Sequence, residues 1–206
     1  MGNRSLNSFR WLQEHINDTY VKQAKIKKLR SRSWFKIQDI QRSDRLFYPG
    51  MVIIELGSSP GGWSKYILSK IGDKGSIIAC DIISMSVMKG VDFIQGDIYN
   101  TITIKKIFKK AKNKNIQLIL SDISHNLSGI AVIDIAKSIY LVKFILKNIC
   151  SILVKGGDFL VKIFQGEGFE ECVHEIRLLF EKVKIRKPVA SRSRSREVYI
   201  VAKKKR

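Results

Sequence analysis

Cysteine and histidine are scarce in this sequence, and their spacing excludes the sites that these residues usually build. The three cysteines, Cys80, Cys150 and Cys172, include no C-x-x-C pair, and the three histidines lack metal-ligand spacing. We therefore expect neither a disulfide framework nor a bound metal, and the composition suits the reducing cytoplasm.

Proline and long apolar runs are also missing. Three prolines in 206 residues exclude collagen-like or proline-rich linker character. No apolar run approaches transmembrane length, and residues 1–15 contain no apolar segment of a signal peptide. We expect a soluble, cytoplasmic protein that has no membrane partner and acts as a monomer.

Acidic residues are few relative to basic ones. The sequence has 38 lysines and arginines but only 18 acidic residues, which gives a formal net charge of +20. Because so much charge opposes compactness by self-repulsion, it usually serves a polyanionic partner, either nucleic acid or an anionic membrane surface. A general lysine bias is the alternative explanation.

Short β-branched runs alternate with longer helical patterns from residue 51 onward. This alternation indicates βαβ units, and hence an α/β, doubly wound, mostly parallel sheet of seven strands. The last two strands have no helix between them and can pair antiparallel. The expected strands cover residues 51–57, 75–81, 92–97, 116–122, 156–164, 183–188 and 197–204. The expected helices cover residues 63–71, 101–112, 131–151 and 168–181.

The N-terminal segment is polar and then basic. Apolar residues from Trp11 to Val21 recur at helical spacing, which predicts a helix over residues 9–29. We therefore divide the chain into a basic extension, residues 1–30, and an α/β domain, residues 31–206, with a basic C-terminal tail.

A glycine-rich turn, GSSPGGW (57–63), follows the first strand and precedes a helix. Such a turn lets the backbone approach a ligand closely, and the helix N-terminus favours negative charge. It matches neither G-x-G-x-x-G nor the P-loop, so a dinucleotide or a nucleoside triphosphate is disfavoured. The alternative is an ordinary βα turn.

Acidic residues end three of the expected strands. Asp81, Asp97 and Asp122 should face one crevice at the carboxyl edge of the sheet. An acid after the second strand can accept hydrogen bonds from ribose hydroxyls, and one after the third can accept from an exocyclic amine. Three such acids favour an adenosine-containing ligand over simple helix capping.

Lys162 interrupts the apolar strand FLVKIF. Lysine is depleted from strands, so a desolvated amine able to act as a base is one interpretation. The other is a side chain that extends to solvent. Lys36 and Glu197 could share its site, although each taken alone is better explained as a surface charge.

Several motifs together carry a family resemblance. They resemble, in order and spacing over about residues 29–202, the FtsJ/RrmJ family of S-adenosylmethionine-dependent RNA 2′-O-ribose methyltransferases. The motifs are WFKIQDIQ (34–41), ELGSSPGGWS (55–64), ACD (79–81), SDISHNLSG (121–129), LVKIFQGEGF (160–169) and SREVYIVA (195–202).

The resemblance implies a class I, Rossmann-like methyltransferase fold and S-adenosylmethionine as the cofactor. It implies a uridine ribose in the A loop of 23S ribosomal RNA as the acceptor, within the assembled large ribosomal subunit. The implied catalytic residues are Lys36, Asp122, Lys162 and Glu197. The implied cofactor residues are Gly57, Gly61, Trp63, Asp81, Asp97 and Asp122.

The sequence departs from the family pattern at two places. Ser124-His125 stands where the family usually has Ala-Pro, and Ser58-Ser59 stands where it commonly has Ala-Ala. Losing that proline frees the backbone of a loop that lines the site. All four catalytic positions remain filled, so we expect an active enzyme.

Basic segments are the expected RNA contacts, because lysine and arginine neutralise phosphates. Solvated surface charge is the alternative. Other hypotheses are a non-catalytic RNA-binding protein, a nicotinamide oxidoreductase and a transfer-RNA ribose methyltransferase of the same family. The expected RNA-binding residues are Lys25, Lys27, Lys28, Arg30, Arg32, Arg192, Arg194 and Arg196.

Overall fold

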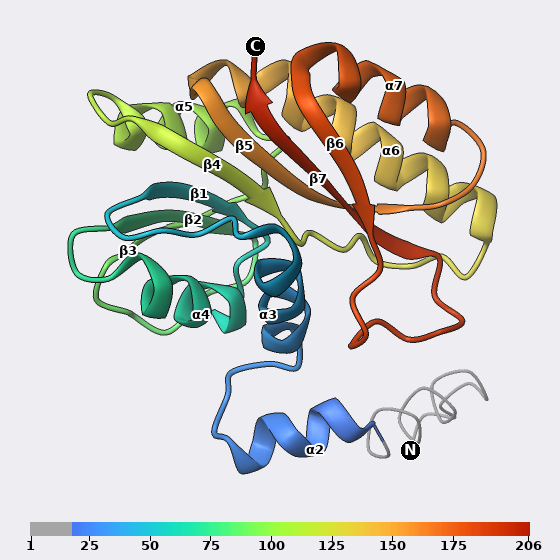
Figure 1. Cartoon of the computed structure of the whole chain (residues 1–206), viewed down its shortest axis with the longest axis horizontal. Helices are drawn as coiled ribbons and strands as arrows, with labels where there is room; N and C mark the ends of the chain where they lie inside the picture. The colour runs from blue at the N-terminus through green and yellow to red at the C-terminus, as the bar shows by residue number, and fades with distance from the viewer. Residues whose placement is uncertain (1–17) are drawn as a thin grey trace.

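The computed structural model describes residues 18–206, whose strands form one seven-stranded sheet in the order β3-β2-β1-β4-β5-β7-β6 (Figure 1). β1, β2, β3, β4 and β5 run parallel, whereas β7 is antiparallel to both of its neighbours. This confirms the predicted fold class. The strands are β1 (Val52–Leu56), β2 (Ser76–Asp81), β3 (Val91–Gln95), β4 (Ile116–Ser121), β5 (Leu153–Phe164), β6 (Phe180–Arg186) and β7 (Glu197–Lys205).

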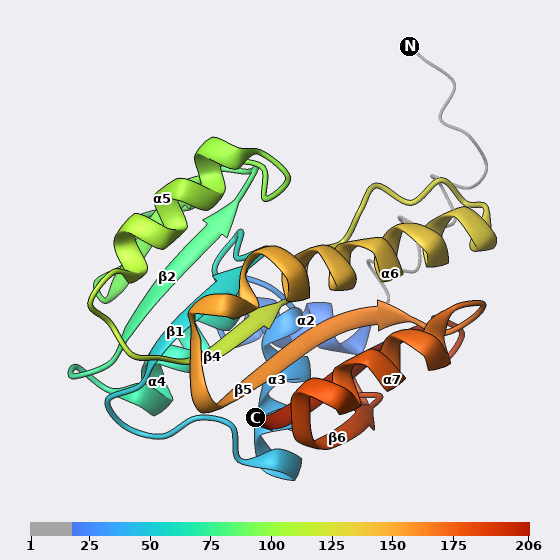
Figure 2. The ribbon, with the colours of Figure 1, turned by 90° about the horizontal axis from the view of Figure 1, so that it is seen from above.

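Helices cover both faces of the sheet (Figure 2). α5, α6 and α7 pack on one face, and α3 and α4 pack on the other. Successive strand residues such as Ile53 and Ile54 are therefore both fully buried, because neither face meets water. The helices are α2 (Thr19–Ile26), α3 (Ser33–Asp44), α4 (Gly62–Ile71), α5 (Thr101–Ala111), α6 (Ala131–Asn148) and α7 (Phe169–Leu179).

The N-terminal helix is shorter than predicted. Asp18 has extended backbone, and its carboxylate accepts hydrogen bonds from the amides of Tyr20 and Val21, so α2 begins at Thr19 rather than continuing through this position. α2 ends at Ile26, not at residue 29. The rest of the predicted helix, residues 9–17, lies outside the described residues.

α3 has no counterpart among the predicted elements. It carries WFKIQ and ends at Asp44. The next residue, Arg45, adopts the left-handed conformation where a glycine usually stands. β6 begins at Phe180, three residues before the predicted strand, because α7 ends at Leu179 with no turn residue between them. Over residues 18–206, no helix has the length and apolar character needed to cross a membrane.

Candidate active site

A cavity of about 400 Å³ lies at the carboxyl ends of β1, β2 and β4. Gly57, Asp81, Asp97 and Asp122 all line it, so the structure brings the predicted turn and the three strand-end acids together. The volume falls within the range of about 300–1,000 Å³ that is typical of ligand pockets.

Gly57 is required where β1 enters the turn. Its φ is 76°, and a Cβ there would lie 2.7 Å from the backbone nitrogen of Ile123. Its amide donates to the carbonyl of Cys80 at 2.8 Å. The turn is therefore wedged between the ends of β2 and β4, and any side chain at Gly57 would push these segments apart.

Asp81 and Asp97 are held by backbone amides. The two carboxylate oxygens of Asp81 accept from the amides of Ser59, at 2.8 Å, and Ile83, at 2.9 Å. The exposed Asp97 accepts from the amide of Tyr99 at 2.9 Å. Each carboxylate oxygen can accept more than one hydrogen bond, so both acids retain capacity for hydroxyl or amine donors of a ligand.

Gly61 and Trp63 lie behind the turn. Gly61 is the N-cap of α4 with φ 94°, and a Cβ there would meet the guanidinium of Arg30. Trp63 is 2% exposed, donates from its indole to the carbonyl of Ser33, and packs its ring against Tyr199. The structure therefore gives these two residues a role in shaping the turn, and their contact with a cofactor stays a prediction.

Glu55 is a buried acid that is not among the predicted site residues. Its Oε2 accepts from the hydroxyl of Ser64 at 2.6 Å, whereas Oε1 has no hydrogen-bond partner among the described residues. Burial raises the pKa of Glu55 to about 8, and the nearby charge of Asp122 adds to this effect. A carboxyl group in an otherwise apolar strand was the signal that could have found it.

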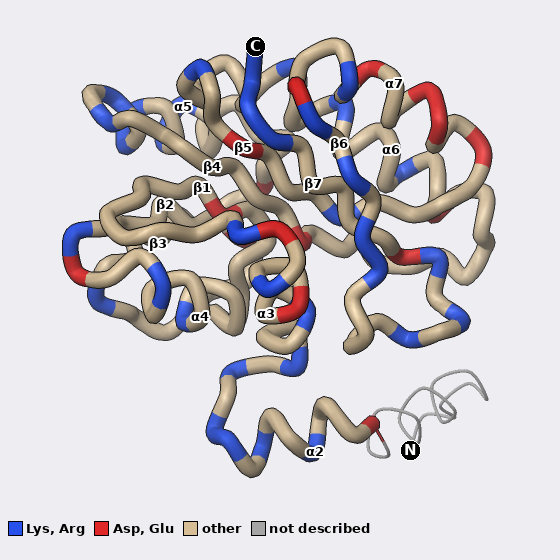
Figure 3. Tube along the Cα trace, viewed as in Figure 1, with Lys and Arg blue, Asp and Glu red and all other residues tan. Residues whose placement is uncertain are grey.

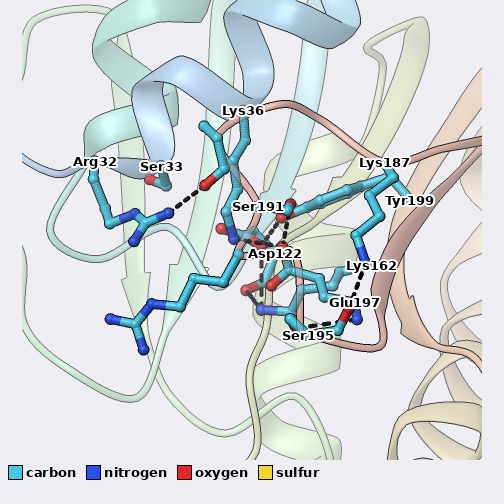
Figure 4. Close-up of polar contacts among 12 residues, drawn as sticks. Arg32, Ser33, Lys36, Asp122, Lys162, Lys187, Ser191, Ser195, Glu197 and Tyr199 are labelled. Atoms are coloured by element: carbon cyan, nitrogen blue, oxygen red, sulfur yellow. Dashed lines mark hydrogen bonds and ion pairs between the residues drawn. The ribbon is translucent and has the colours of Figure 1, made fainter. Parts of the chain in front are cut away.

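The four predicted catalytic residues meet as two ion pairs (Figure 4). The Lys162 amine, on β5, lies 3.2 Å from Oδ1 of Asp122 and donates to the Asp122 carbonyl at 2.8 Å. The Lys36 amine, on α3, donates to Oε1 of Glu197 at 2.6 Å. Lys162 is 7% exposed, so its amine is held by Asp122 rather than by water.

Tyr199 joins the two pairs. It faces Lys162 across the β5–β7 ladder, and its hydroxyl donates to Oδ1 of Asp122 at 2.8 Å. The Lys36 amine lies 5.8 Å from the centre of its ring. Burial and the nearby carboxylates raise the pKa of Tyr199 well above its ordinary value, so the hydroxyl stays a donor. Its position two residues after Glu197 on one strand face could have suggested this role.

Charge and hydrogen bonding set the ionisation of Asp122. Its burial favours the neutral acid, but Lys162 and Lys36, with hydrogen bonds from Tyr199 and Lys162, outweigh burial and lower its pKa. We call Lys36, Asp122, Lys162, Tyr199 and Glu197 the charged cluster. Asp122 is therefore an ionised carboxylate that belongs both to the cavity and to this cluster.

Two of the eight predicted RNA-binding residues are held by contacts within the chain, and the other six are placed by the element that carries them. Figure 3 shows where lysines and arginines lie along the backbone. The guanidinium of Arg30 donates to the carbonyls of Pro60 and Ser86, and that of Arg32 contacts the Ala190 carbonyl and Asp18. These two arginines brace the chain's own loops. The others lie on α2, just after it, and on the loop between β6 and β7.

The described part of the chain contains no candidate metal site. Between residues 18 and 206, no group of three or more histidine, cysteine, aspartate or glutamate side chains is placed to hold an ion. The acids of the cavity instead face backbone amides and lysine amines.

This chain is similar to known proteins in sequence and in architecture. A family model described as FtsJ-like methyltransferase matches residues 29–205. The crystal structure of a protein described as a ribosomal RNA methyltransferase from Plasmodium falciparum superposes with a TM-score of 0.76 at 25% sequence identity. The match covers 85% of this chain and 98% of that chain.

Proposed function

The chain belongs to the FtsJ-like methyltransferase family, and from this premise we propose that it methylates a ribose 2′-oxygen of RNA with S-adenosylmethionine as the donor. One observation carries the proposal: Asp122 lines the cavity and also holds the Lys162 amine. A donor in the cavity and an acceptor beside Lys162 would therefore meet at a single residue.

The residues of the cavity fit S-adenosylmethionine. Asp81 would accept from the ribose hydroxyls, Asp97 from the adenine amine, and Asp122 would face the methionyl end. Backbone at Gly57, together with Gly61 and Trp63, would shape the turn around the ligand. When bound, S-adenosylmethionine supplies an electrophilic methyl group on a sulfonium centre.

Lys162 orients the acceptor hydroxyl. An ammonium group has three N–H donors, and two of those on Lys162 are directed at the carbonyl and carboxylate of Asp122, which leaves one for a substrate oxygen. In one version Lys162 is a free amine that takes the proton of the 2′-hydroxyl as the new bond forms. In the other it only aims the oxygen lone pair, and proximity supplies most of the acceleration.

Lys36 and Glu197 would complete the site on the acceptor side. Glu197 is held by Lys36 and by the hydroxyl of Ser191 at 2.8 Å, so its carboxylate is fixed before substrate arrives. Such preorganisation avoids reorganisation during the reaction.

We assign ribosomal RNA as the substrate, with an A-loop uridine of 23S RNA in the assembled large subunit as the acceptor and the cytoplasm as the location. The formal charge of +20 supports a polyanionic partner. Of the eight basic residues named above, those other than Arg30 and Arg32 would contact phosphates directly, and binding should weaken steeply with salt. A transfer-RNA ribose is the alternative acceptor.

The test uses RNA that lacks the modification. Total RNA and ribosomal subunits from a deletion strain are incubated with the protein and tritiated S-adenosylmethionine, and the labelled nucleotide is mapped. Label in the A loop of large-subunit RNA is the expected result, whereas label in transfer RNA would establish the alternative. A folded, cofactor-binding protein that labels no RNA would overturn the proposal.

A further inference from the structure

A second hollow adjoins the cofactor cavity and is walled by aromatic rings. Its volume is about 450 Å³, and its lining includes Tyr99, His125, Lys137 and Tyr140. Tyr99 and His125 also line the cofactor cavity, so these two residues form the wall between the hollows. Nothing in the proposed chemistry uses this second hollow.

Three aromatic rings lie close together and near parallel, and we call this group the aromatic platform (Tyr99, His125 and Tyr140). The Tyr99 ring lies 6.3 Å from that of His125 at 13°, and 5.8 Å from that of Tyr140 at 29°. Phe144 meets Tyr99 edge-on at 4.8 Å and supports it from within α6. Tyr140 is nevertheless 62% exposed, so a large apolar ring face is open to a partner.

His125 is fixed in a form that suits stacking. Its Nε2 lies 3.1 Å from the carbonyl of Lys137, and because a carbonyl only accepts, this nitrogen carries the hydrogen. Burial lowers the pKa of His125, which favours the neutral ring. His125 lines the same cavity as Asp97 and Asp122, so the ring borders the proposed cofactor site.

We propose that the aromatic platform binds an unstacked base of the RNA substrate, beside the nucleotide that is methylated. This inference rests on the proposed function and deepens it by assigning a substrate subsite. Proteins recognise single-stranded RNA by stacking splayed bases on aromatic side chains, and the platform offers near-parallel rings next to the site of reaction. The exposed Lys137 at its rim supplies a positive charge for the adjoining phosphate.

The side chains that line the second hollow indicate how selective the platform would be among RNA bases. Stacking uses the π-face that every base has, so contact through rings tolerates sequence. The polar side-chain groups of the lining are the hydroxyls of Tyr99 and Tyr140, the Lys137 amine and the His125 ring, and Nε2 of that ring already bonds the Lys137 carbonyl. We therefore expect the platform to add affinity and to fix the orientation of the RNA, with little base preference.

The experiment compares Tyr140→Leu, which keeps apolar bulk but removes the ring, with Tyr140→Phe, which keeps the ring. Tyr48→Leu is the matched control, because Tyr48 is 51% exposed and precedes β1 at the opposite edge of the sheet. For each variant, steady-state kinetics with unmodified large subunits give KM and kcat, and calorimetry gives the Kd for S-adenosylmethionine. Melting temperatures confirm folding.

Tyr140→Leu should raise KM for RNA about tenfold or more, a loss in the range known for one stacked base. The Kd for S-adenosylmethionine should not change, and Tyr140→Phe and Tyr48→Leu should behave like the unmutated protein. An unchanged KM in Tyr140→Leu, or an equal rise in Tyr48→Leu, overturns the proposal. Weaker cofactor binding in Tyr140→Leu would assign the platform to the cofactor and also overturn it. Failure of the proposed function itself is distinguishable, since the unmutated protein would then label no RNA.

Discussion

The cofactor cavity and the charged cluster lie side by side, but different contacts hold them. In the cavity, the acids are fixed by backbone amides, as Asp81 is by those of Ser59 and Ile83. In the cluster, side chains hold side chains: Lys162 pairs with Asp122, and Lys36 pairs with Glu197. Asp122 is the residue common to both regions.

This difference predicts how each region responds to substitution. A cavity shaped by backbone keeps its form when one lining side chain changes, so the loss is limited to that side chain's own contact with ligand. A buried charge in the cluster depends on its partner, and removing either partner leaves the other without compensation. Changes in the cluster should therefore abolish chemistry, and changes in the cavity should weaken binding.

The largest effect is expected from Lys162→Ala. Removing the amine that orients the acceptor should lower kcat about 10²–10⁴-fold. The Kd for S-adenosylmethionine, measured by calorimetry, should change far less than kcat, because Lys162 does not line the cavity and acts on it only through Asp122. Lys155→Ala, at the exposed far end of the same strand, is the control and should be fully active. Near-normal turnover in Lys162→Ala would remove this residue from the mechanism.

Tyr199→Phe should have the next largest effect. It deletes the hydroxyl that donates to Asp122 but keeps the buried ring, so the carboxylate loses one charge-assisted hydrogen bond. Such a loss costs about 1–3 kcal/mol, which predicts a kcat lower by about tenfold or more. Tyr66→Phe, at a buried tyrosine on α4, is the matched control. If kcat is retained while KM rises instead, Tyr199 is not a positioning residue of the cluster.

Asp97→Ala tests whether the cavity binds the cofactor. It should raise the Kd for S-adenosylmethionine about tenfold, which corresponds to one hydrogen bond, with kcat retained at saturating cofactor. Asp92→Ala, at an acid of β3 that pairs with Lys110 instead, should leave the Kd unchanged. A loss of kcat at saturating cofactor would contradict the separation of the two regions.

The remaining prediction concerns the pH dependence of stability, which affects catalysis least. The folded protein holds a proton on Glu55 up to a pKa of about 8, whereas the unfolded chain releases it near the ordinary value of 4.5. The folded state binds more protons between these values, so Glu55 lowers stability as pH rises, by at most about 1.4 kcal/mol per pH unit. Denaturant titrations should show this slope reduced in Glu55→Gln. The same slope in both proteins would mean that Glu55 is ionised when folded.

Much of the fold was predictable because its signals are local. Each buried strand is an apolar run, and the acids Asp81, Asp97 and Asp122 follow such runs directly, so their meeting at one edge of a parallel sheet follows from topology. The four predicted catalytic positions came from the family resemblance, and the structure brings the four side chains together.

The missed features depend on contacts between distant segments. The local sequence places Tyr199 on the same strand face as Glu197, but the register that sets it opposite Lys162 depends on the pairing of two distant strands. The aromatic platform likewise joins residues from the loop after β3, the loop after β4, and α6. α3 was missed because its buried residues alternate with charged ones, and no glycine or proline marks its ends.

The most direct test asks which atom receives the methyl group. RNA labelled with tritiated S-adenosylmethionine is hydrolysed in alkali, which cannot cleave the phosphodiester beside a 2′-O-methylated ribose. The account predicts that the label is recovered in an alkali-stable dinucleotide. Label in a mononucleotide that carries a methylated base would contradict it.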